Sequence, residues 1–287
     1  MKAPPFAYAR AATTEDALGL LAEAGSEAKI LAGGQSLLPL LAYRLIRPTH
    51  LVDIGGIGSL SAARPGKGEV VLDGLVRHAT IEQMDLVGSH VLLRETAAAI
   101  GHLPIRTRGT LAGSLAHADP AAELPIAAVA LNGSVALRSI RGERLVAAES
   151  YFRGPFTTAL EPDELLTALV VPPSPDGAGA SFVEFAVRAG DFAIAAAAVV
   201  VGLEDDRVGH LRIVLGGVDA TPLRANAAEA LLSGERPTLE AIAAAAAAAA
   251  AQCDPVSDQR GSATFRRELV DTLVQQSLKR ALERCSS

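Results

Sequence analysis

The sequence predicts an α+β fold in two domains, one covering residues 1–175 and the other covering residues 176–287. Three observations support this fold class. The first 55 or so residues alternate between helical and strand-like patterns. The stretch PPSPDGAGA at 172–180 is rich in proline and glycine, as linkers are. The C-terminal third contains strand-like segments followed by helical ones, which is typical of a separate α+β domain.

The N-terminal segment predicts a small α/β unit. Thr14 precedes two acidic residues and a run of apolar residues at helical spacing, and Gly25 can end that helix. Strands are expected over 28–31 and 50–54. The turn AGGQS at 32–36 follows the first of these strands and precedes an apolar helix. Free backbone N–H groups are therefore expected to point outward at this turn.

The remaining elements are assigned from β-branched content, turn residues and helical periodicity. In the first domain we expect strands and helices at 69–77 (strand), 90–100 (helix), 133–146 (a hairpin turning at Arg141–Gly142) and 164–171 (strand). In the second domain we expect three antiparallel strands and then helices, at 181–188, 193–203, 208–217, 224–232, 243–251 and 264–284.

The composition excludes several classes of protein. The net charge of −6 and the absence of a basic stripe argue against nucleic acid as a partner. Cys253 and Cys285 are far apart in the sequence, which excludes a disulfide framework and an iron–sulfur site within this chain. We expect no signal peptide and no membrane span, and hence a cytoplasmic protein.

Two glycine-bearing bends are the main candidates for chemistry. In AGGQS, successive N–H groups could form an anion nest suited to a pyrophosphate, although a purely structural turn is an alternative. The stretch from Ile105 to Pro125 mixes hydroxyls and glycines with leucines, so it could line a groove or form a buried crossover. The histidines show no metal-binding spacing and no catalytic dyad is visible. If the protein does chemistry, a cofactor is expected to supply it.

Five segments in order carry a resemblance to a known family. They are FAYARAATTEDALGLLAEAG (6–25), AGGQS (32–36), TLAGSLAHADP (110–120), VRAGDFAIA (187–195) and DQRGSATFRRELVDTLVQQSLKRAL (258–282). Together they resemble the flavoprotein (medium) subunit of molybdenum hydroxylases, the carbon monoxide dehydrogenase and xanthine dehydrogenase family. The resemblance implies a two-lobed FAD-binding domain of the vanillyl-alcohol-oxidase (PCMH) type. A small domain of the carbon monoxide dehydrogenase flavoprotein type, with a three-stranded antiparallel sheet and helices, would follow it.

The same resemblance implies an FAD site in which the two bends come together on one dinucleotide. The first bend would wrap the pyrophosphate with Leu31, Ala32, Gly33, Gly34, Gln35, Ser36 and Leu37. The second would contact phosphate and ribityl groups with Thr110, Leu111, Ala112, Gly113 and Ser114. Residues expected near the polyol or the flavin ring are Asp119, Glu123, Leu165, Leu166 and Phe192.

Two positions qualify this expectation. Ala112 stands where relatives often have glycine, and its methyl group is tolerable if φ is negative there. Gln35 stands where some relatives have a histidine, and glutamine cannot form a covalent link to flavin. The resemblance therefore implies that FAD binds without a covalent bond.

The implied function is electron transfer, with no catalytic or metal-ligating residue in this chain. Iron–sulfur clusters in a small subunit would deliver electrons from a molybdopterin-containing large subunit, and FAD here would pass them to an external acceptor. The implied assembly is a dimer of heterotrimers. Two alternatives remain open: a stand-alone FAD-dependent oxidase of the same fold, and a non-enzymatic adaptor with a decayed flavin site. The sequence does not identify the substrate or the acceptor.

Overall fold

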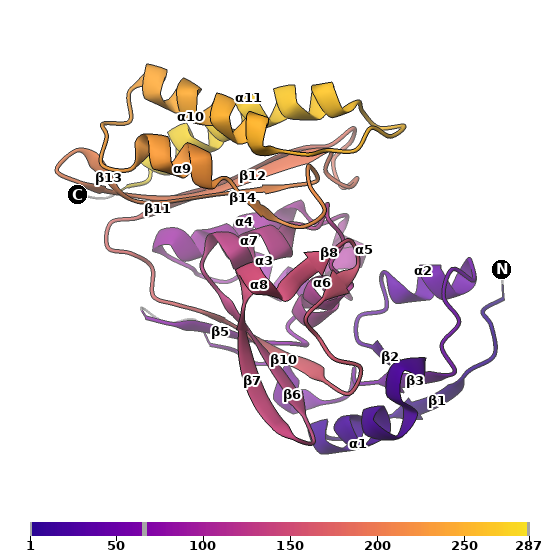
Figure 1. Cartoon of the computed structure of the whole chain (residues 1–287). Helices are drawn as coiled ribbons and strands as arrows, with labels where there is room; N and C mark the ends of the chain where they lie inside the picture. Colours follow the sequence, from indigo (N-terminus) through magenta and orange to yellow (C-terminus); the bar gives the residue numbers. More distant parts are fainter. Residues whose placement is uncertain (1, 65–67, 286–287) are drawn as a thin grey trace.

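Three sheets carry the fold of this chain, described here from a computed structural model that covers residues 2–64 and 68–285. Figure 1 shows a small sheet on the lower right (the first tier), a five-stranded sheet on the lower left (the central tier) and, at the top, a four-stranded sheet below the C-terminal helices (the third tier). The α+β fold class expected from the sequence is confirmed.

The first tier is a parallel sheet in the order β1-β3-β2. Its elements are β1 Ala7–Arg10, α1 Thr14–Ala24, β2 Ala28–Leu31, α2 Leu37–Ala42 and β3 His50–Asp53. The N-cap of α1 is Thr13, one residue before the expected start, and it forms a capping box with Asp16. Gly25 follows α1 with φ +57°, a conformation that favours glycine, so the predicted helix end is confirmed.

The central tier is an antiparallel sheet in the order β4-β5-β10-β6-β7. Its strands are β4 Ala63–Arg64, β5 Val70–Asp73, β6 Ser134–Ser139, β7 Gly142–Ala147 and β10 Leu165–Val171. The predicted hairpin over 133–146 is confirmed as the β6–β7 pair. The helices and the small β8–β9 ribbon of this tier are α3 His78–Glu82, α4 Val91–Ala99, α5 Leu103–Arg106, α6 Leu111–His117, α7 Glu123–Ala130, α8 Ala148–Tyr151, β8 Phe152–Gly154 and β9 Thr157–Thr158.

The strand expected over 69–77 is wrong in its length. β5 ends at Asp73, and Gly74 turns the chain there, since its N–H donates to the carbonyl oxygen of Thr167 at 2.7 Å. A Cβ atom at Gly74 would lie 2.7 Å from the carbonyl oxygen of Leu166. Gly74 therefore lies so close to β10 that only glycine fits there, and β5 ends before it. The apolar run over 69–77 gives no sign of this contact.

The third tier is an antiparallel sheet in the order β11-β12-β13-β14. Its elements are β11 Gly179–Phe185, β12 Ala195–Glu204, β13 Arg207–Gly216, β14 Leu223–Arg224, α9 Asn226–Leu232, α10 Leu239–Gln252 and α11 Ala263–Leu282. The three predicted strands are confirmed as antiparallel. The two-residue β14 adds a fourth strand that the prediction lacked, because two residues give no periodic signal.

The third tier sits directly on α7 of the central tier. Gly216 at the end of β13 leaves room for Ile126, since a Cβ atom at this glycine would collide with the Ile126 side chain. The N–H of Gly217 donates to the carbonyl oxygen of Pro120 at 2.8 Å, just before α7 begins. In Figure 1, α4 and α7 lie between the two sheets. This contact fixes the C-terminal tier beside the stretch 110–125.

Arg266 joins α11 to this sheet, and its replacement by leucine is expected to destabilise the chain. Its guanidinium donates to the carbonyl oxygens of Ile194 at 2.6 Å and Gly217 at 2.9 Å, and to both oxygens of Asp258. Because Arg266→Leu leaves these buried carbonyls without a donor, we expect the free energy of unfolding to fall by about 2–3 kcal/mol. Urea denaturation measures this, with Arg280→Leu at an exposed position of α11 as the control. Equal effects of the two substitutions would contradict the expectation.

Candidate functional site

The two glycine-bearing bends lie against each other, backbone to backbone. Gly33 is buried, and a Cβ atom there would collide with the carbonyl oxygen of Arg108 and lie 3.0 Å from the Cα of Gly109. No side chain larger than hydrogen fits between the two segments. The bends are therefore brought together, as the family resemblance implied.

The first bend presents a run of unused backbone donors. Within the described part of the chain, the N–H groups of residues 33–37 donate to no acceptor. Gly34 has φ +75°, and the Gln35 side chain closes the turn by donating to the carbonyl oxygen of Gly33 at 3.2 Å. Leu31 ends β2, so the donors follow the strand directly. Consecutive free N–H groups of this kind suit an anion such as a phosphate.

The second bend is the capped start of a helix, an element that the sequence analysis did not assign. Thr110 is the N-cap of α6, and its Oγ1 accepts the N–H of Gly113 at 3.1 Å. The N–H groups of Leu111 and Ala112 already donate, to the carbonyl oxygens of Val76 at 3.0 Å and Gly74 at 2.9 Å. Their side chains are buried, so these two residues support the bend instead of offering donors.

The outer face of this helix start remains accessible. Gly113 is exposed and Ser114 is half-buried. Ala112 has no positive φ, and its methyl group faces Gly74, 3.0 Å from where a Cβ would stand there. The φ of Ala112 therefore meets the condition set for it, and its methyl group points toward the buried Gly74.

Two predicted carboxylates follow α6. Ala118, with φ +49°, ends this helix, and Asp119 Oδ1 accepts the N–H of Ala121 at 2.9 Å. Glu123 is the first residue of α7 and only 7% exposed. Burial raises the pKa of Glu123 to about 8, and the nearby carboxylates of Glu184 and Asp119 add to the shift. This carboxyl group is therefore held largely protonated at neutral pH.

Glu184 on β11 is a candidate that the sequence did not reveal. It pairs with Ala196, which in turn pairs with Gly216, the glycine that receives Ile126 of α7. Glu123 lies one helical turn before Ile126, so the two glutamates converge from different tiers. Burial raises the pKa of Glu184 to about 7, and its Oε2 is buried with no hydrogen-bond partner in the described chain.

Comparisons with known proteins identify the family to which this arrangement belongs. Residues 4–174 match the family described as FAD binding domain in molybdopterin dehydrogenase. Residues 180–281 match the CO dehydrogenase flavoprotein C-terminal domain. The chain is an FAD-binding medium subunit of the molybdenum hydroxylase family.

Individual members of this family match the chain over nearly its full length. The chain is 41% identical over 286 residues to the 6-hydroxypseudooxynicotine dehydrogenase complex subunit alpha of Paenarthrobacter nicotinovorans, covering 99% of this chain and 97% of that protein. It is 40% identical to the nicotine 6-hydroxylase medium subunit of the same organism, covering 98% and 99%. A chain of the carbon monoxide dehydrogenase of Hydrogenophaga pseudoflava superposes with a TM-score of 0.96 at 36% identity, covering 100% of both chains.

The geometry of this medium subunit fits FAD at the two bends. A dinucleotide carries an anionic pyrophosphate, and the free donors of residues 33–37 are the groups that such an anion needs. Thr110 adds an N–H that donates to nothing in the described chain. The contact between the two bends leaves no space for a side chain at position 33, which accounts for the glycine there.

The apolar residues expected near the flavin differ in how accessible they are. Leu165 and Leu166 of β10 are buried in two separate cores, so any contact with FAD would use only their edges. Phe192 is 54% exposed, and the guanidinium carbon of Arg260 lies 5.5 Å from its ring centre. The same loop reaches the first domain, because Gly190 packs on the ring of His102, close to α5 and the second bend.

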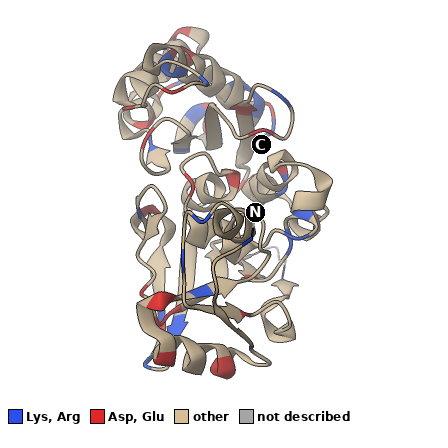
Figure 2. Cartoon of the chain, turned by 90° about the vertical axis from the view of Figure 1, so that its right-hand side faces the viewer, with Lys and Arg blue, Asp and Glu red and all other residues tan. Residues whose placement is uncertain are grey.

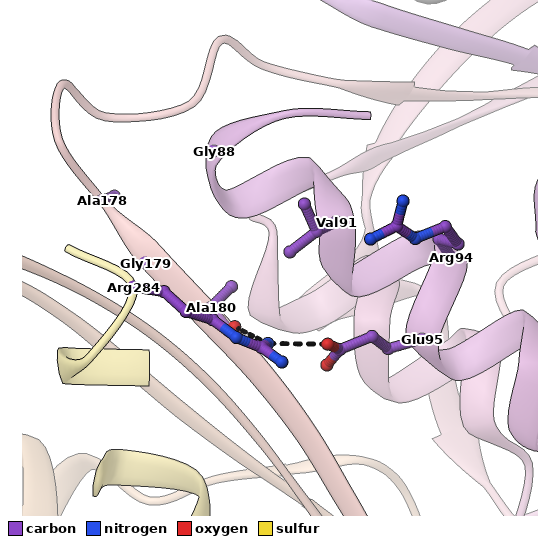
Figure 3. A pocket seen from close by; sticks show the side chains of 8 residues that line it. All are labelled: Gly88, Val91, Arg94, Glu95, Ala178, Gly179, Ala180 and Arg284. Atoms are coloured by element: carbon purple, nitrogen blue, oxygen red, sulfur yellow. Dashed lines mark hydrogen bonds and ion pairs between the residues drawn. The ribbon is translucent and has the colours of Figure 1, made fainter. Parts of the chain in front are cut away.

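A cavity of about 220 Å³ lies elsewhere in the medium subunit, between α4 and β11 (Figure 3). An ion pair crosses it, in which Arg284 Nη1 is 2.6 Å from Glu95 Oε1 and also donates to the carbonyl oxygen of Ala180 at 2.6 Å. None of its lining residues belongs to either bend. This cavity is therefore separate from the candidate FAD site.

The described residues form neither a basic surface nor a metal site that would suggest a ligand other than FAD. Figure 2 shows acidic and basic residues interspersed along the visible ribbon, without a continuous basic stripe. Over residues 2–64 and 68–285, no cluster of three His, Cys, Asp or Glu side chains could hold a metal ion. None of the described helices is long and apolar enough to cross a membrane.

Proposed function

We propose that this chain receives electrons from the iron–sulfur clusters of a partner subunit and passes them, through non-covalently bound FAD, to an external acceptor. The observation that carries this proposal is the contact of the Gly33 bend with Arg108 and Gly109, which places unused N–H groups beside a capped helix start. The bound flavin would supply the oxidation–reduction chemistry. The residues of the chain hold and orient it.

The geometry of each segment supports the contacts that we propose with FAD. The N–H groups from Ala32 to Leu37 and that of Thr110 would bind the pyrophosphate, with Ser114 on the accessible face of α6. Asp119 and Glu123 would receive hydrogen bonds from the polyol chain or the flavin. Leu165, Leu166 and Phe192 would provide the apolar surroundings of the ring.

The cysteines support a partner as the electron source. The chain contains only Cys253 and Cys285, and burial raises the pKa of Cys253 to about 12 and raises the pKa of Cys285 as well. A cluster needs several thiolates, and these two thiols are held protonated. We therefore propose an iron–sulfur small subunit and a molybdopterin-containing large subunit as partners, in a dimer of heterotrimers in the cytoplasm.

Two further assignments accompany this proposal. We place the domain division near residue 175, between the end of β10 at Val171 and the start of β11 at Gly179. The large subunit would determine the substrate. The names of the nicotine- and carbon-monoxide-metabolising relatives indicate different substrates, while this chain is 41%, 40% and 36% identical to their respective subunits.

The proposal predicts a yellow protein without iron. The full-length chain, purified gently, should show flavin absorbance, and acid precipitation should release the FAD into the supernatant, because residues 31–37 and 110–114 include no histidine or cysteine for a covalent link. Metal analysis should find no iron in this chain. A colourless protein that takes up no added FAD would contradict the proposal, and flavin that stays with the precipitate would contradict non-covalent binding.

One observation favours a stand-alone flavin oxidase as the second candidate. Such an enzyme needs an acid/base group, and Glu123 and Glu184 have pKa values near neutrality, about 8 and about 7. The C-terminal tier nonetheless offers few aromatic or titratable side chains for a substrate cap. Steady-state oxidation of small alcohols by the isolated, FAD-loaded chain separates the two functions. Turnover supports the oxidase, and none supports the electron-transfer subunit.

A further inference from the structure

Two adjacent residues hold three consecutive carbonyl groups of the second bend. Arg77 Nη1 donates to the carbonyl oxygen of Arg108. The backbone N–H of His78 donates to the carbonyl oxygen of Gly109 at 3.2 Å, and its Nε2 lies 2.9 Å from the carbonyl oxygen of Thr110. The acceptors at 108, 109 and 110 are thus all engaged by residues 77 and 78.

The imidazole of His78 is a neutral donor. Because a carbonyl oxygen can only accept, the hydrogen must reside on Nε2. The other ring nitrogen, Nδ1, is buried with no partner in the described chain, so a second proton there would have no acceptor. Burial accordingly lowers the pKa of His78 to about 4. The ring keeps one tautomer and one hydrogen bond throughout the neutral range.

The ring of His78 also packs closely against Gly109 of the second bend. A Cβ atom at Gly109 would lie 2.7 Å from both Cε1 and Nδ1 of His78. The backbone of Arg108 and Gly109 also lies against Gly33 of the first bend. The segment 108–109 therefore packs against both the imidazole ring of His78 and the first bend.

These bonds determine where the free donor of the second bend points. In a trans peptide the N–H points opposite to the C=O. The carbonyl of Gly109 is held toward His78, so the N–H of Thr110 in the same peptide unit points away from it. This N–H donates to nothing in the described chain. Thr110 is only 1% exposed, so this N–H is a buried donor without a partner in the described chain, and an acceptor on a ligand would satisfy it only while the peptide keeps this orientation.

We infer that Arg77 and His78 are positioning residues for the FAD site. They hold the carbonyl groups of residues 108–110 in the orientation in which the Thr110 N–H and the N–H groups of the Gly33 bend can bind the same pyrophosphate. This inference rests on the proposed function, because FAD is the ligand at these bends. It assigns a role to two residues that would not contact the cofactor themselves.

The test compares two substitutions at His78 with a matched histidine elsewhere. His78→Leu removes the donor and should raise the Kd for FAD about tenfold, while His78→Gln keeps an amide donor of similar reach and should stay within about threefold of wild type. His90 is the control, since it is equally buried and its Nε2 lies 2.8 Å from the carbonyl oxygen of Pro172. His90→Leu should lower the melting temperature and leave the Kd unchanged.

The measurement is fluorescence titration of the full-length chain with FAD, alongside thermal unfolding of each variant. Arg77→Met serves as a second variant if His78→Leu fails to fold, because Arg77 is only half-buried. It should also weaken FAD binding. If His78→Leu or Arg77→Met binds FAD as wild type does, or if His90→Leu weakens binding equally, the inference is wrong and the proposed function stands. If the wild-type chain itself takes up no FAD, the proposed function fails.

Discussion

Gly33→Ala is expected to weaken FAD binding by roughly 10- to 100-fold. The added methyl group would collide with the carbonyl oxygen of Arg108 and sit against Gly109, both backbone atoms that cannot rotate away. The bends must then separate. The donors of residues 33–37 and of Thr110 could no longer face one pyrophosphate together.

The control for this experiment is a glycine whose replacement by alanine should not change FAD binding. Gly19 lies within α1 and has no atom within 4 Å of a built Cβ, so Gly19→Ala should retain FAD and even stabilise the helix slightly. Both variants are purified as full-length chains, and flavin content and the Kd for FAD are measured. A Gly33→Ala protein that binds FAD as tightly as Gly19→Ala would show that the contact between the bends is not needed for the cofactor.

Glu123→Gln is expected to remove about half of a pH-dependent loss of stability in the cofactor-free chain. Burial raises the pKa of Glu123 from 4.5 to about 8, so between these values the folded chain binds more protons than the unfolded chain. Stability therefore falls as pH rises through this window, and the full penalty is present above the folded-state pKa. Glutamine has no carboxyl group to ionise, so the variant does not incur this penalty. At pH 8 we expect the variant to be more stable by roughly 2–4 kcal/mol.

Urea denaturation at pH 5 and pH 8 measures this effect. The wild type should lose stability between the two pH values, and Glu123→Gln should lose about half as much. The remaining loss comes from Glu184, whose pKa is raised to about 7 and which titrates in the same window. Glu23→Gln on an exposed position of α1 is the control and should retain the wild-type slope. An unchanged slope in Glu123→Gln would show that its carboxyl group is not held protonated by burial.

Sequence patterns predicted the elements whose signals are local. The β6–β7 hairpin, the three long strands of the C-terminal tier and the helix ended by Gly25 all follow from turn residues and periodicity within a few positions. The two glycine-bearing bends were also recognisable, since small and hydroxyl-bearing residues stood between apolar runs. The family resemblance then supplied the expectation that the bends meet.

What sequence reasoning missed depends on contacts between distant residues. Nothing about Glu184 distinguishes it from an exposed strand residue until strand register places it opposite α7. The hydrogen bond of His78 Nε2 to the carbonyl oxygen of Thr110 joins two residues that no sequence pattern relates to each other. The start of α6 did have a signal, a threonine cap before leucines four residues apart, but the small residues Ala112, Gly113 and Ser114 between them concealed it.

The fit of Ile126 into Gly216 limits how this protein can be recombined with its relatives. A chimaera joined in the 172–180 stretch would inherit α7 from one parent and β13 from the other. If the second parent carried any side chain in place of Gly216, the isoleucine would strike it and lift the C-terminal half away from Glu123. Exchange of halves should therefore succeed only when these two positions are transferred as a matched set.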